Sequence, residues 1–195
     1  MPGSIKIDDG SGNYTILTNA GSLGSDKTIT IPNETATLAT TNGVTVADQW
    51  YLTTNQASNG DITSWSQVSF TGTGTVGSSM SHSSGVFTFP STGIYKIHFG
   101  AFHELNGDDR GIGAEIHTTT NNSTYSYAAQ GVTFIKQTSS STTYASSSSE
   151  FLFDVTDTST HKCRFVISLV NSSTQTNGNS TANLTYVTFT RLGDT

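Results

Sequence analysis

The chain has 195 residues, of which 11% are charged, and its formal net charge at pH 7 is −6. Only 8 residues are Lys or Arg and none form a basic run, which argues against nucleic-acid binding. No apolar stretch reaches the roughly 18 residues of a membrane-spanning helix, so we expect no membrane insertion. The first residues lack the apolar core of an export signal. Cys163 is the sole cysteine, which excludes an intrachain disulfide and favours a buried thiol.

Short apolar runs with period-two alternation recur along the chain, separated by clusters of Gly, Ser, Thr and Asn. No window carries a sustained apolar stripe with helical spacing. Aromatic residues make up 10% of the sequence, enough to build a core. The pattern predicts an all-β protein, a sandwich or barrel.

Residues 1–43 carry four small apolar sets that Gly and Pro interrupt. Each set is too small to bury itself within one chain. We therefore expect an extended β-arm that winds with copies of itself or attaches to another protein, with Asn42-Gly43 as the boundary turn. The attachment candidates are Ile5, Ile7, Tyr14, Ile16, Ile29, Ile31 and Leu38.

The segment Thr28–Thr40 reads TITIPNETATLAT. It resembles a phrase found in the N-terminal segments of bacteriophage fibre proteins. The resemblance implies that the arm binds other virion proteins.

Residues 44–195 contain about nine candidate strands, which suits a jelly roll of about ten. Three long turn-rich segments, at 71–84, 139–149 and 171–183, are expected to be loops. The expected strands are 49–53, 64–70, 86–89, 93–105, 111–118, 125–135, 150–155, 163–170 and 184–192.

Two motifs bracket this second region. The first spans Gly85–Tyr95 and reads GVFTFPSTGIY; the second spans Tyr186–Gly193 and reads YVTFTRLG. Together they resemble the opening and closing motifs of C1q/TNF-like trimeric jelly-roll domains. The resemblance implies that fold and a threefold assembly. Unlike animal C1q proteins, the chain has no collagen-like Gly-x-y stalk, which argues against a complement-type role.

Several expected strands are apolar on both faces, whereas a solvated sheet alternates apolar and polar residues. One face can pack inside a sandwich, and the other then needs a cover. A neighbouring subunit is the simplest cover, and loops of the same chain are the alternative. The candidate interface residues are Ile94, Phe102, Leu152, Val166 and Val170.

Metal binding and catalysis receive little support from the sequence. The spacing of His98, His103 and His117 does not demand zinc, and the oxygen-rich turn 106–109 supplies too few ligands for calcium. No nucleophile elbow or phosphate loop is present. We predict no enzyme activity, no metal and no cofactor.

Aromatic side chains beside hydroxyl and amide groups suit carbohydrate recognition. The candidate glycan contacts are Trp65, Tyr125, Tyr127 and Tyr144, with ordinary packing as the alternative.

The sequence thus predicts a non-enzymatic, homotrimeric structural protein on the surface of a phage virion, assembled in the host cytoplasm. It would be a short tail fibre or a capsid decoration, with host surface carbohydrate as a candidate ligand. The alternative is a cellular C1q-like or lectin-like adhesion module.

Overall fold

The structure is a computed structural model that describes residues 4–8, 14–18 and 43–195. The chain divides into two compact units, Met1–Thr40 and Thr41–Thr195. In the first unit, β1 (Ser4–Asp8) pairs antiparallel with β2 (Tyr14–Thr18). Of the attachment candidates, Ile29, Ile31 and Leu38 lie outside the described residues.

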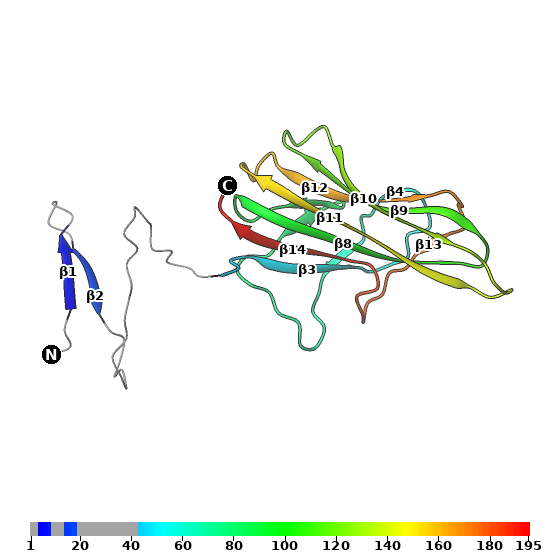
Figure 1. Cartoon of the computed structure of the whole chain (residues 1–195), viewed down its shortest axis with the longest axis horizontal. Helices are drawn as coiled ribbons and strands as arrows, with labels where there is room; N and C mark the ends of the chain where they lie inside the picture. The colour runs from blue at the N-terminus through cyan, green and yellow to red at the C-terminus, as the bar shows by residue number, and fades with distance from the viewer. Residues whose placement is uncertain (1–3, 9–13, 19–42) are drawn as a thin grey trace. The chain divides into compact units, whose positions relative to one another are not determined.

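The second unit, called the head below, consists of two antiparallel six-stranded sheets (Figure 1). The β8 sheet has the order β11-β8-β14-β3-β5, with β13 paired to β8. Its strands are β3 (Ala47–Leu52), β5 (Trp65–Gln67), β8 (Gly93–Leu105), β11 (Thr143–Val155), β13 (Gln175–Thr176) and β14 (Tyr186–Gly193).

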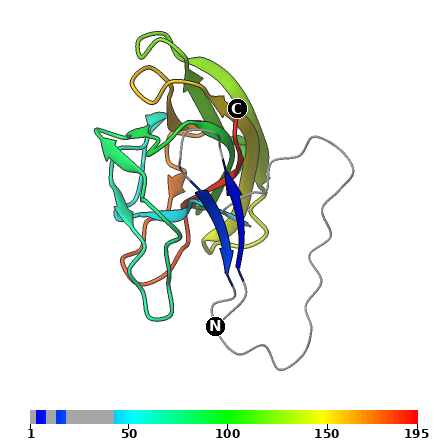
Figure 2. The same ribbon diagram turned by 90° about the vertical axis from the view of Figure 1, so that its left-hand side faces the viewer.

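The β9 sheet has the order β10-β9-β12-β7-β6, with β4 paired to β12. Its strands are β4 (Gly60–Asp61), β6 (Ser81–Ser83), β7 (Val86–Thr88), β9 (Asp109–Thr119), β10 (Ser126–Ile135) and β12 (Lys162–Leu169). Seen from its end in Figure 2, the head shows strands curving around a shared interior. In the described part of the chain, no helix is long and apolar enough to cross a membrane.

The all-β prediction is confirmed, and β8 has the predicted bounds. The largest error concerns the Ser-rich segment 139–149, whose second half belongs to β11. Ser147 and Ser149 are buried there, and the whole strand pairs in register with β8. Three strands of two or three residues, β4, β6 and β13, carry no readable alternation and were not predicted.

The core is an aromatic cluster between the two sheets. Phe87 and Phe165 from the β9 sheet meet Phe189 from the β8 sheet, with ring centroids 5.2–6.0 Å apart. All three side chains have no exposed surface. Such edge-to-face and tilted pairs stabilise by about 0.5–1.5 kcal/mol beyond the burial of their area. The cluster therefore holds the two sheets face to face.

The opening and closing motifs touch each other in the folded head. Gly93 has φ +141°, and a Cβ built there would lie 2.4 Å from Arg191 Nε and 2.5 Å from the Gly193 carbonyl oxygen. Arg191 Nε donates to the Thr92 carbonyl at 2.7 Å. Because Gly93 has no side chain, the Arg191 side chain can pack there and bind β14 to the start of β8.

The variant Gly93→Ala is expected to lower the free energy of unfolding by about 1–3 kcal/mol, because it adds backbone strain and displaces Arg191. Urea denaturation measures the change. Gly74→Ala is the matched control, since a Cβ at Gly74 meets nothing within 4 Å. A Gly93→Ala variant as stable as the Gly74→Ala variant would contradict this role.

Candidate functional site

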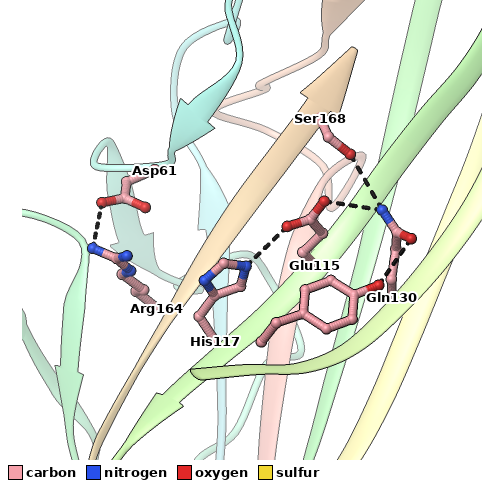
Figure 3. A network of polar contacts seen from close by, with 7 residues as sticks. Asp61, Glu115, His117, Gln130, Arg164 and Ser168 are labelled. Carbon is pink, nitrogen blue, oxygen red and sulfur yellow. Dashed lines mark hydrogen bonds and ion pairs between the residues drawn. The ribbon is translucent and has the colours of Figure 1, made fainter. Parts of the chain in front are cut away.

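The outer face of the β9 sheet carries a network of polar side chains (Figure 3). Alternation along β9 and β12 turns Glu115, His117, Arg164 and Ser168 outward while Ile116, Phe165 and Ile167 enter the core. The register sets Arg164 opposite His117 and Val166 opposite Glu115. Residues far apart in the sequence therefore form adjacent rows on one surface.

Glu115 is the centre of the network. One carboxylate oxygen accepts a hydrogen bond from His117 Nε2 at 2.8 Å, and the other accepts one from Gln130 Nε2 at 2.9 Å. Gln130 Nε2 also lies 3.3 Å from Ser168 Oγ, and its Oε1 accepts from the Tyr127 hydroxyl at 2.8 Å. Each side chain is thus held by its neighbours, with the donors and acceptors facing outward.

Arg164 forms the other end of the network. Its guanidinium donates to Asp61 at 3.0 Å and lies 4.3 Å from the centre of the Tyr125 ring. Burial raises the pKa of the Tyr125 hydroxyl, an effect that the nearby Arg164 charge partly opposes. The positive charge of Arg164 is therefore balanced by Asp61 and shielded by an aromatic face.

Next to the network lies a hollow of about 230 Å³, which we call the Gly113 trough. Gly111 and Gly113 of β9 form part of its lining, together with Val132, Val170, Leu169, Gln130 and Ser168. A Cβ at Gly113 would lie 2.3 Å from Ser168 Oγ and 2.4 Å from Gln130 Nε2. The trough therefore depends on glycine at that position.

The five residues predicted for a trimer interface are divided between the outer faces of the two sheets. Ile94, Phe102 and Leu152 lie on the β8 sheet, where their strand neighbours Tyr95 and Phe153 point into the core. Val166 and Val170 lie with β12 on the β9 sheet, and Val166 is half-buried opposite Glu115 and Asp61. The five side chains do not form one continuous surface.

The outer face of the β8 sheet carries large apolar side chains beside the charged pair Lys96–Glu150. Leu152 is 57% exposed, and Phe102 stacks on Tyr144 with the ring centroids 5.5 Å apart. A shallow hollow of about 380 Å³ lies around Gly100, between Ser146, Ser148 and Tyr186. Large apolar side chains thus flank a stretch of small ones.

The four residues predicted to contact a glycan also lie in different parts of the head. Trp65 was predicted wrongly: it is 5% exposed, its ring packs on Phe87 and Phe165, and its indole nitrogen donates to the Ile62 carbonyl. Tyr144 lies on the β8 sheet, whereas Tyr125 and Tyr127 border the β9 network. Only these last two share a surface.

His103 is fully buried, with its ring nitrogens 2.9 Å from Thr176 Oγ1 and 2.8 Å from Ser147 Oγ. Burial lowers its pKa to about 4, although the Asp109 charge acts in the opposite direction. The ring is therefore a neutral part of the core. Burial likewise raises the pKa of the Cys163 thiol, which leaves it protonated.

The oxygen-rich turn at 106–109 has its carboxylates engaged by protein groups. Asp109 is 1% exposed and accepts hydrogen bonds from the Gly111 amide, the Asn171 amide and the Thr174 hydroxyl. Asp108 pairs with Lys136 at 2.6 Å, and this contact lowers its pKa. Within the described residues, no group of three or more His, Cys, Asp or Glu side chains is placed to hold a metal ion.

Solved structures with a similar fold identify the architecture. The chain is similar to the Eiger TNF of S. frugiperda, with a TM-score of 0.56 and 13% identity over 77% of this chain and 94% of that one. It is also similar to murine APRIL at pH 5.0, with a TM-score of 0.54 and 10% identity over 75% and 98% of the two chains. The head is a TNF-like jelly roll. No protein-family model and no curated protein sequence matches the chain.

Gln130 and Ser168 were not selected from the sequence as partners of Glu115 and His117, since they come from other strands. The pair Gly111 and Gly113 inside an expected strand could have pointed to this region. Glycine within a strand often marks a β-bulge or a place where another group approaches the backbone closely.

We predict that the stability of the head falls as the pH drops from about 6.5 towards 4. The unfolded chain protonates His103 near its ordinary pKa of 6.5, whereas the folded chain does so only near 4. The unfolded state therefore binds more protons across this window, and up to about 3 kcal/mol of stability is lost. Denaturant titrations at several pH values measure the slope.

The variant His103→Gln should flatten this slope, although it lowers stability at neutral pH. His98→Gln, on the outer face of β8, is the matched control and should keep the original slope. Equal slopes for the wild type and His103→Gln would contradict the assignment.

Proposed function

We propose that the protein is a non-enzymatic, homotrimeric structural protein of a phage virion surface, in which the head projects outward and residues 1–43 attach it. It would serve as a short tail fibre or a capsid decoration that presents the head to the host surface. The observation that carries the proposal is the set of apolar side chains, Ile94, Phe102 and Leu152, on the outer face of the β8 sheet of a TNF-like head.

The β8 face suits contact with another copy of the chain. Ile94, Phe102 and Leu152 present apolar surface, while Gly100 and the nearby serines permit close approach. Fully burying an exposed Phe or Leu side chain contributes roughly 1.5–3 kcal/mol, and covering the 57% of Leu152 that is exposed contributes a share of that. Lys96 and Glu150 on this face already pair at 2.8 Å, so a subunit contact can cover them as a pair.

Threefold symmetry is supported by the two motifs that resemble C1q/TNF-like domains, and by the TNF-like fold of the head. A phage origin is supported by the fibre-like phrase at Thr28–Thr40. The absence of a recognised catalytic motif from the sequence supports a binding or structural role.

The β9 face suits solvent or ligand better than a subunit contact. It holds two ion pairs, Glu115–His117 and Asp61–Arg164, and covering them costs desolvation that their pairing repays only if every polar group is satisfied. Among the described residues, the buried Arg164 Nε has no hydrogen-bond partner. We therefore assign the β8 face to the trimer and leave the β9 face open.

Leu152→Asp should convert the protein from about three times the chain mass of 20.6 kDa to a single chain, because it places a charge in the covered face. Size-exclusion chromatography with light scattering measures the mass. Val170→Asp, on the β9 sheet and equally exposed, is the matched control and should remain trimeric. A wild-type protein that is monomeric at micromolar concentration would overturn the trimer.

Removal of residues 1–43 should leave a folded trimeric head that no longer joins virions. The head has its own core and two complete sheets, so its fold does not need the arm. Immunoblotting of purified particles from a complemented phage measures incorporation. Equal incorporation of the truncated and complete chains would show that the arm is not the anchor.

A further inference from the structure

The Gly113 trough combines apolar walls with a polar end. Val132 and Val170 are 64% and 57% exposed, and they line the hollow together with Gly111 and Gly113. Gln130 and Ser168 line it as well, and both belong to the Glu115 network. A sugar ring has the same division, since its C–H groups form an apolar face and its hydroxyls line the edge.

Hydrogen bonds within the protein already hold the polar side chains at the end of the trough in place. Glu115 holds Gln130 on one oxygen and His117 on the other, and its side chain is 13% exposed. The two N–H groups of Gln130 are held by Glu115 and Ser168, and its Oε1, which accepts from Tyr127, keeps one acceptor position for a sugar hydroxyl. The Ser168 hydroxyl accepts from Gln130 and can still donate its own proton. Groups held in this way lose little side-chain entropy when they bind a ligand.

A register shift in β10 between Tyr127 and Ala129 brings an aromatic ring to the same end. Tyr127 lies opposite His117, is 56% exposed, and is tied to Gln130 through its hydroxyl. Bulges of this kind re-aim side chains beside binding sites. The ring therefore provides an apolar surface next to the hydrogen-bonding groups.

The charges of this face favour a neutral ligand. Asp61 pairs with Arg164 at 3.0 Å and Glu115 pairs with His117 at 2.8 Å, so the network's guanidinium is already matched by a carboxylate. The chain as a whole carries a net charge of −6. An anionic sugar would meet Glu115 with no free cation from the network to balance it.

We propose that the Gly113 trough binds one neutral pyranose ring of a surface glycan, with hydroxyls on Gln130 and Ser168 and the C–H face on Val132 and Val170. The hollow is smaller than the roughly 300–1,000 Å³ of pockets for drug-sized ligands, which suits a single ring. The inference rests on the proposed function, because the trimer must leave the β9 face open.

Saturation-transfer NMR on the full-length protein tests the site, with the methyl pyranosides of glucose, galactose, mannose and N-acetylglucosamine as neutral probes and sialic acid as the anionic comparison. At least one neutral probe should bind saturably, with a Kd on the order of 1–10 mM for so small a contact. Gln130→Ala and Val170→Asp should each weaken binding at least fivefold. Gln137→Ala, which lies outside the trough, is the matched control and should bind as the wild type does.

Light scattering on the same samples separates this inference from the proposed function. Absence of neutral-sugar binding by a protein that is trimeric overturns the trough assignment alone. Unchanged binding in Gln130→Ala and Val170→Asp, or a preference for sialic acid, overturns it as well. A monomeric wild-type protein contradicts the trimer instead, whether or not sugar binds to it.

Discussion

Burial of one aromatic cluster between two sheets is the constraint on which the head depends. Phe87, Phe165 and Phe189 meet there without exposed surface, and each belongs to a strand whose side chains alternate in direction. A slip of one residue along β12 would bring Arg164 and Val166 into the core and expel Phe165. The cluster therefore determines the register of β12, and through it the side chains that reach the outer face.

The two outer faces that result have different chemistry. The β8 sheet presents Phe102, Leu152 and a floor of small residues, which favours contact with another apolar surface. The β9 sheet presents a hydrogen-bonded chain centred on Glu115, next to a trough with glycine in its lining. The two faces of a single sandwich thus differ in chemistry, one with exposed apolar side chains and the other with a hydrogen-bonded polar network.

Two glycines illustrate how an absent side chain makes room for neighbouring side chains. At Gly93, the missing Cβ admits Arg191 and joins the opening motif to the closing one. At Gly113, the backbone is ordinary, and the missing Cβ instead makes room for Ser168 Oγ and Gln130 Nε2, which a side chain there would displace. Both spaces are filled by side chains of the protein itself.

The sequence by itself determined the fold class, the bounds of β8 and the faces of Ile94, Phe102 and Leu152, because period-two alternation in a long strand is a local property. The sequence indicated the wrong environment for Trp65, which lies in a three-residue strand too short to show alternation. It also missed that Ser147 and Ser149 are buried in β11, because a serine-rich composition is typical of a loop. Only the tertiary structure decided that Glu115, Gln130 and Ser168 meet, and that Val166 and Val170 face away from Ile94. These arrangements depend on the register between strands distant in sequence, which the packing of the whole core fixes.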